Sequence, residues 1–332
     1  MKKAFTLIEL IVAVALLAMI LSFSGLIFKV SIETYRTAGA NAEIMQKLRA
    51  ITSQLDTDFK AIRTDTPLLI WFKQDDPNRY DQVMFFANGD FASTQLYENG
   101  NNAVPDPNGN RLVIGNVARL FYGQAQPDPN LLARRQHILT ADTELDEWPH
   151  ADMSDFNSSG AGGMLNEWYE HDSLSLAQWK TIVGDAYRDK IIPTCFASRP
   201  LIDMDYPNTF HKLMCEGVGS FAVQWAYWDS GDGRFYWFPS NDPDGDGEID
   251  DSHFRLIGNE FGVFFNIPNG SSFSVEGCWW YPIGDDNVKY KLGESFPSDF
   301  YPKAIKFTFR LYDSKGVIKN GREFTHIVYL GE

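Results

Sequence analysis

The sequence predicts an α+β fold in which one long N-terminal helix packs on an antiparallel β domain. Three observations support this fold: an apolar run near the N-terminus, an apolar stripe at helical spacing after it, and short alternating segments through the rest of the 332 residues. The 44% hydrophobic and 22% charged content is typical of a folded protein. The net charge of -15 argues against a phosphate backbone as a ligand, so we expect no nucleic-acid partner.

The first predicted element is a membrane-spanning helix. Nineteen uncharged residues run from Leu10 to Phe28, and at 1.5 Å per residue they extend about 28 Å, close to the thickness of a bilayer core. Residues 5–28 are therefore predicted to cross the membrane. Because Lys2 and Lys3 precede the run, the positive-inside rule predicts a single pass with a cytoplasmic N-terminus. A cleaved secretory signal peptide would share the charged start, but this run is long for one and no clear small-x-small cleavage site follows it.

Glu9 stands at the beginning of the apolar run. A carboxylate inside an apolar helix is costly unless it finds a partner, so Glu9 is predicted to be functional.

The heptapeptide AFTLIEL, from Ala4 to Leu10, resembles the processing site of type IV pilins and type II secretion pseudopilins. The resemblance implies that residues 1–4 are a leader and that a prepilin peptidase cuts between Ala4 and Phe5 and methylates the new amino group. It also implies that Glu9 neutralises the N-terminal amine of a neighbouring subunit, and that the chain sits in the bacterial inner membrane. The residue before the cut is usually Gly in that family, and Ala4 departs from this pattern.

After Lys29 the helical pattern continues. Apolar residues recur every three or four positions and form one stripe: Ile44, Leu48, Ile51, Leu55, Phe59 and Ile62. Pro67 follows the stripe, and proline does not continue a helix. We therefore expect one helix from Phe5 to about Arg63, with residues 29–63 as its amphipathic part.

The remainder, residues 64–332, is predicted to be a periplasmic, β-rich domain. Apolar and aromatic segments with strand character are separated by polar turns, as at Glu98–Asn110 and at Asp229–Gly233. The predicted strands are Pro67–Phe72, Gln82–Ala87, Arg111–Gln124, Ala133–Leu139, Gly219–Trp228, Arg234–Phe238, Ile305–Tyr312 and Phe324–Leu330.

Several later segments resemble the J-type minor pseudopilin of type II secretion: LRAITSQLDTDFKAIR, LFYGQAQPDPNLLARRQHIL, GVGSFAVQWAYW and YPKAIKFTFRLYD. The resemblance implies a structural subunit at the pseudopilus tip, with other minor pseudopilins and the major pseudopilin as partners. The chain is longer than the family norm, and we assign the excess to insertions at about residues 140–212 and 240–298. Within the first insertion, Ser175 and Gln178 form a capping-box pattern ahead of a short amphipathic helix that is expected to pack on the sheet. Two alternatives stay open: a minor pilin of a type IV pilus, and a membrane-anchored calcium-dependent lectin or adhesin.

The segment Asn241–Asp251 is similar to the first positions of an EF-hand calcium loop, with alternating carboxylates and Gly247 at the sharp turn. Position twelve of such a loop is His253, so Asp250 or Asp251 has to replace the usual bidentate carboxylate. The competing interpretation is a solvated acidic turn, but carboxylates gathered without a cation repel one another. The predicted calcium ligands are Asp242, Asp244, Asp246, Glu248, Asp250 and Asp251.

No enzyme signature is present. The six histidines show no His-Glu-x-x-His spacing, and neither a Gly-x-Ser-x-Gly elbow nor a phosphate-binding Gly-x-x-x-x-Gly-Lys occurs. The chain is therefore predicted not to be an enzyme. Cys195 and Cys215 are either bridged in an oxidising periplasm or left as buried thiols.

Overall fold

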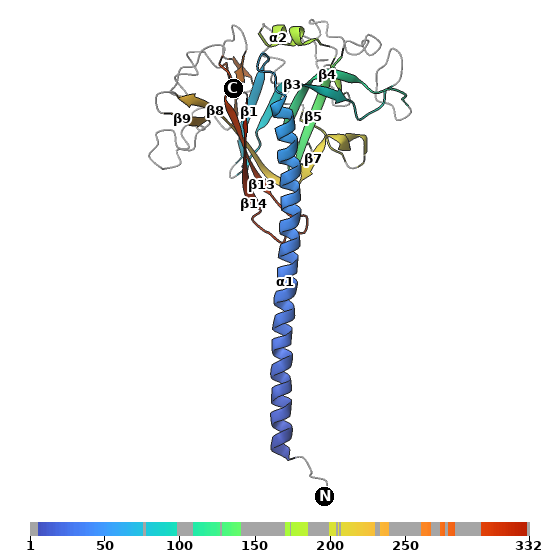
Figure 1. Cartoon of the computed structure of the whole chain (residues 1–332), viewed down its shortest axis with the longest axis vertical. Helices are drawn as coiled ribbons and strands as arrows, with labels where there is room; N and C mark the ends of the chain where they lie inside the picture. Colours follow the sequence, from blue (N-terminus) through green and yellow to red (C-terminus); the bar gives the residue numbers. More distant parts are fainter. Residues whose placement is uncertain are drawn as a thin grey trace.

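The computed structural model describes residues 6–75, 78–97, 109–126, 128–140, 170–172, 174–184, 199–203, 205, 207–229, 233–238, 260–266, 273–275, 278–282 and 300–330. It confirms the α+β fold: a long N-terminal helix packs on a β domain whose strands are mainly antiparallel (Figure 1).

Helix α1 spans Leu7–Lys60, 54 residues, which corresponds to about 80 Å at the usual helical rise. It begins and ends within a few residues of the predicted limits. Figure 1 shows the N-terminal half projecting away from the domain as a stalk, while the C-terminal half lies against the sheets. Ala40 is the first buried residue of the helix.

The predicted apolar stripe is the face that α1 buries. Ile44, Ile51, Leu55 and Phe59 are fully buried, and Leu48 and Ile62 are partly buried against the same core. The ring of Phe59 lies 4.2 Å from Phe85 of one sheet and 5.2 Å from Phe307 of the other, measured between centroids. The helix therefore covers the junction between two sheets.

The larger sheet has ten strands within the described part of the chain, in the order β11-β12-β10-β1-β3-β4-β5-β6, with β2 beside β1 and β7 beside β5. Only β10 with β12 and β5 with β6 pair in parallel in this sheet. Its strands are β1 (Leu68–Asp75), β2 (Asn78–Arg79), β3 (Gln82–Ala92), β4 (Ile114–Gln124), β5 (Leu131–Leu139), β6 (His171–Asp172), β7 (Leu213–Glu216), β10 (Glu260–Phe265), β11 (Phe273–Val275) and β12 (Cys278–Pro282). Residues 240–298, which we assigned to an insertion, thus add three strands to this sheet.

The smaller sheet has the order β14-β13-β8-β9. Its strands are β8 (Val218–Asp229), β9 (Arg234–Phe238), β13 (Ala304–Leu311) and β14 (Arg322–Tyr329). The predicted alternation of β13 is confirmed: Ile305, Phe307, Phe309 and Leu311 are buried against α1, and the intervening residues face outward.

Asp81 joins the two sheets. Its backbone N–H donates to the Phe221 carbonyl at 3.0 Å, and its carboxylate accepts from the N–H groups of Lys73 at 3.0 Å and Val223 at 2.7 Å. The Arg79 guanidinium pairs with the same carboxylate. Because this buried carboxylate accepts from donors on several strands, it fixes the position of β8 relative to β1 and β2.

The far face of the larger sheet carries helix α2 (Leu176–Gly184) and the 3-10 helix η3 (Pro207–Lys212). The capping box predicted for α2 is present, because Ser175 N–H donates to the Gln178 side chain at 2.8 Å and Gln178 N–H donates to the Ser175 hydroxyl at 3.3 Å. Trp179 is buried with its ring 5.9 Å from Phe86 of β3. The expectation that this helix packs on the sheet is confirmed.

Candidate functional site

The start of α1 places Glu9 in a capping box with Thr6. The Glu9 carboxylate accepts from the N–H and the hydroxyl of Thr6, both at 2.9 Å, and Thr6 accepts from the Glu9 N–H at 3.3 Å. Within the single chain the carboxylate is therefore held at the helix N-terminus and is exposed. Ala4 and Phe5, the predicted processing residues, lie outside the described residues.

The stalk of α1 exposes an apolar surface on all sides. Large side chains from Leu7 to Ile32 are more than half exposed, and the helix is long and apolar enough to cross a membrane, with a mean hydropathy of 2.7 over its most apolar window. A core helix of a soluble protein would be mostly buried, but none of that window is. The surface requires lipid or other helices around it.

The stalk leaves the domain at the turn after β13. Lys47 donates to the Tyr312 carbonyl at 3.0 Å, and Glu43 accepts from the N–H of Ser314 at 2.8 Å. Gly217 has a φ of 74°, and a Cβ there would lie 2.9 Å from the Tyr312 carbonyl oxygen and 3.1 Å from the Lys47 amine. These contacts fix the direction in which α1 emerges.

The turn itself is built on Asp313. Its carboxylate accepts from the N–H groups of Ile318, Val317 and Lys315 at 2.8, 2.9 and 3.2 Å, which lowers the pKa of this group below its ordinary value. Asp313 is thereby held as a carboxylate that closes the turn.

A buried ionic cluster, which sequence reasoning missed, fastens α1 to β4 and β5. Asp58 accepts from the Arg134 guanidinium through both oxygens, at 2.6 and 3.1 Å, and from the Tyr122 hydroxyl. Burial, together with the charge of Asp58, raises the pKa of Tyr122 well above its ordinary value, so its hydroxyl stays a donor. The available signal was an aspartate three residues from Leu55, on the apolar side of the helix, with an Arg-Arg pair in a buried strand.

A second cluster of buried polar side chains lies between α2 and the larger sheet. The Arg119 guanidinium is 3.4 Å from the Asp172 carboxylate and stacks 4.8 Å from the Trp179 ring, whose Nε1–H donates to Asp172 at 2.9 Å. His137 lies opposite Arg119 in the β4–β5 register and is buried, and among the described residues neither of its ring nitrogens has a hydrogen-bond partner. Sequence reasoning did not predict that these residues meet in one buried cluster.

The predicted calcium ligands, Asp242, Asp244, Asp246, Glu248, Asp250 and Asp251, all lie outside the described residues. Among the residues that the structure describes, no group of three or more His, Cys, Asp or Glu side chains could hold a metal ion. The calcium site stays a prediction.

Cys215 is a free, buried thiol whose pKa is raised to about 11, chiefly by burial. Whether Cys195 pairs with Cys215 stays open. Cys195 lies outside the described residues.

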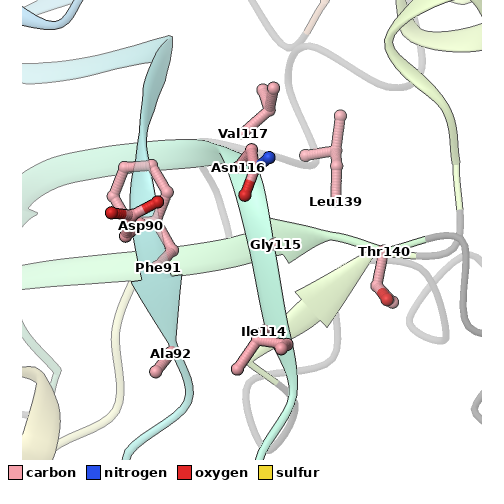
Figure 2. A pocket seen from close by; sticks show the side chains of 9 residues that line it. All are labelled: Asp90, Phe91, Ala92, Ile114, Gly115, Asn116, Val117, Leu139 and Thr140. Carbon is pink, nitrogen blue, oxygen red and sulfur yellow. The ribbon is translucent and has the colours of Figure 1, made fainter.

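A shallow pocket of about 630 Å³ opens where β3 and β5 end and β4 begins (Figure 2). Its wall is mainly apolar, with Phe91, Ile114, Val117 and Leu139, and Asp90 is the one ionisable side chain among its lining residues. A lone exposed carboxylate beside apolar side chains offers no pair of catalytic groups.

Residues 1–25 match the family model of the prokaryotic N-terminal methylation motif. No curated protein and no solved structure matches the chain. The motif is the signal of type IV pilin-like proteins, which are structural subunits rather than enzymes, and it implies processing by a prepilin peptidase and assembly with other pilins. The match covers the first 25 of the 332 residues, and it agrees with the long, exposed apolar helix near the N-terminus.

Proposed function

We propose that this chain is a minor pseudopilin of a type II secretion system, most similar to the J type, and that it is a structural subunit of the pseudopilus tip. The observation that carries the proposal is the N-terminal methylation motif on a 54-residue helix whose second half is fastened to an antiparallel β domain. In this proposal residues 5–28 cross the inner membrane once, the N-terminus is cytoplasmic and the domain is periplasmic. Its partners are the other minor pseudopilins and the major pseudopilin.

In this proposal each part of α1 has a role. The exposed stalk holds the subunit in the membrane and then packs among the helices of neighbouring subunits. Thr6 keeps the Glu9 carboxylate at the helix start, where a neighbour's terminal amine can pair with it. The contacts of Asp58 and Lys47 hold the β domain on the C-terminal half of α1.

Deletion of the gene tests the assignment to secretion. We expect a loss of exported proteins from the culture medium, restored by the wild-type gene, with surface pili unaffected. Loss of pili with normal export would instead identify a minor pilin of a type IV pilus.

The mature N-terminus is expected to be methylated Phe5. The motif at residues 1–25 and the small residue Ala4 before the cut motivate this result. Mass spectrometry of the protein purified from membranes measures it directly. A chain that starts beyond residue 20 would show cleavage as a secretory signal peptide and contradict the proposal.

Glu9→Val is expected to leave the chain in the membrane but to reduce its incorporation into the assembly at least tenfold, because the neighbour's amine then has no carboxylate. Membrane fractionation and crosslinking of whole cells measure the two properties separately. Glu33→Val, on the exposed stalk beyond the apolar run, is the matched control and should assemble normally. Equal incorporation of both variants would show that the charge of Glu9 is incidental.

Calcium at about 0.1–1 mM, the range of weak extracellular sites, is expected to raise the melting temperature of the full chain in detergent. Asp244→Ala with Asp246→Ala should abolish this shift, and the stability in chelator should be unchanged or slightly higher because repulsion is removed. Asp90→Ala with Glu33→Ala removes two exposed carboxylates elsewhere and should keep the shift. If calcium does not change the melting temperature of the wild type, the loop is a solvated acidic turn and not a calcium site.

A further inference from the structure

Four aromatic side chains gather on the outer face of the smaller sheet, the face turned away from α1. Trp228, Phe235, Trp237 and Tyr329 form this aromatic platform. Trp228 is paired with Phe235, and Trp237 lies in one cross-strand row with Tyr329. Trp228 is 49% exposed and Tyr329 is 63% exposed. Exposed aromatic area of this kind on one face is typical of an interaction surface.

The rings of the platform contact one another across the sheet and form one continuous surface. β9 and β14 are separated by two strands, so their backbones lie about 14 Å apart, yet the rings of Phe235 and Tyr329 are 6.1 Å apart between centroids. In the cross-strand row that joins Trp237 to Tyr329, the residues on the two central strands are Ala226 and Ala304, and both are fully buried. Small residues on the central strands let the flanking rings lean together over them.

Lys306 borders the platform and has no carboxylate partner within the part of the chain that the structure describes. Its amine lies 4.5 Å from the centre of the Trp237 ring, a cation–π contact. Burial, with Arg79 nearby, lowers the pKa of this lysine. The chain as a whole carries 44 acidic against 29 basic residues, yet none of the described acidic side chains pairs with this half-buried cation. Charge complementarity therefore points to an occupant that brings a carboxylate.

The ring angles favour a protein over a polysaccharide. Trp228 and Phe235 meet at 72°, Phe235 and Tyr329 at 51°, and Phe235 and Trp237 at 38°. Rings inclined to one another do not make a flat stacking surface for sugars. They make an uneven apolar surface into which the side chains of another protein can pack. Aromatic residues and arginine are enriched at the positions that contribute most of the binding energy of protein interfaces.

The position of the platform makes it accessible to a neighbouring domain. The inner face of the same sheet is occupied by α1, through contacts such as Phe59 with Phe307. The outer face therefore points away from the chain's own stalk, and a domain standing beside it on the same membrane can reach it.

We propose that the aromatic platform with Lys306 is the docking surface for the globular domain of another motif-bearing subunit, which presents a carboxylate among apolar side chains. This inference rests on the proposed function, because it takes the partner from the same assembly.

In-cell photo-crosslinking of the full chain tests the proposal. A photoreactive phenylalanine analogue is placed at position 228 or 329, and at Asn116, an exposed residue of β4 in the other sheet, as the control. We expect positions 228 and 329, but not 116, to give a product that mass spectrometry identifies as a second protein with an N-terminal methylation motif. Lys306→Glu should lower the yield at least tenfold, and Lys306→Arg should keep it.

Four results would overturn the docking surface: no product from either platform position, a yield unaffected by Lys306→Glu, a product with a second copy of this chain, or a product with glycan or lipid. Failure of the proposed function is recognised separately. In that case the unlabelled wild-type chain is itself absent from the secretion assembly, whereas failure of the docking surface alone leaves wild-type incorporation normal.

Discussion

Asp58→Ala is expected to lower the free energy of unfolding by about 3–5 kcal/mol, the cost of breaking a buried ion pair by removing one partner. The carboxylate accepts both arms of Arg134 and the Tyr122 hydroxyl in a site where Asp58 and Tyr122 are buried. Its removal leaves a buried phenol and a partly buried guanidinium without this acceptor. Chemical denaturation of the full chain in detergent, followed by tryptophan fluorescence, measures the change.

Two further variants separate the ion pair from ordinary packing. Tyr122→Phe removes one donor and leaves the Arg134 pair, so a smaller loss of about 1–3 kcal/mol is expected. Asp58→Ala combined with Arg134→Met removes both charges, and this double variant should be more stable than Asp58→Ala alone. A double variant at least as unstable as the single one would show that the pair is not the source of the loss.

The helix and most strands could be predicted because they carry a period that burial imposes. Six residues at helical spacing marked the buried face of α1, and the alternation around Phe307 marked the inner face of β13. The strands that escaped prediction are short or lie far along the chain from their partners. β10 pairs with β1, almost two hundred residues earlier, and no local pattern specifies such a pairing.

The residues of the candidate site likewise differ in how far they could be predicted from local sequence. The motif around Glu9 is local, and the family model matches it, so it could be read directly from residues 1–25. Asp58 and Arg134 are 76 residues apart, and only the packing of α1 on β4 and β5 brings them together. The aromatic platform likewise depends on a four-strand order, β14-β13-β8-β9, that no single segment encodes.

Acidification is expected to destabilise the domain through His137 as the pH falls below about 6.5. This side chain is buried, and its ring nitrogens have no hydrogen-bond partner in the part of the chain that the structure describes. Burial is the main cause that lowers its pKa well below the ordinary value, and nearby basic groups add to it. These groups are Arg119 on β4, Arg135 on β5, Lys212 on η3 and His171 on β6.

The sign follows from proton linkage. Between the ordinary pKa of about 6.5 and the lower folded pKa, the unfolded chain binds a proton at this position and the folded chain does not. Stability is therefore complete above pH 6.5 and falls by up to about 1.4 kcal/mol per pH unit below it, or roughly 2 kcal/mol by pH 5.

His137→Leu removes the titrating group and two unpartnered polar atoms together, so its free energy of unfolding should decline less steeply between pH 6.5 and 5 than that of the wild type. The carboxylates that titrate at lower pH are common to both proteins and cancel in the comparison. Identical slopes for wild type and His137→Leu would contradict the assignment, since the proton taken up on unfolding would then belong to another group.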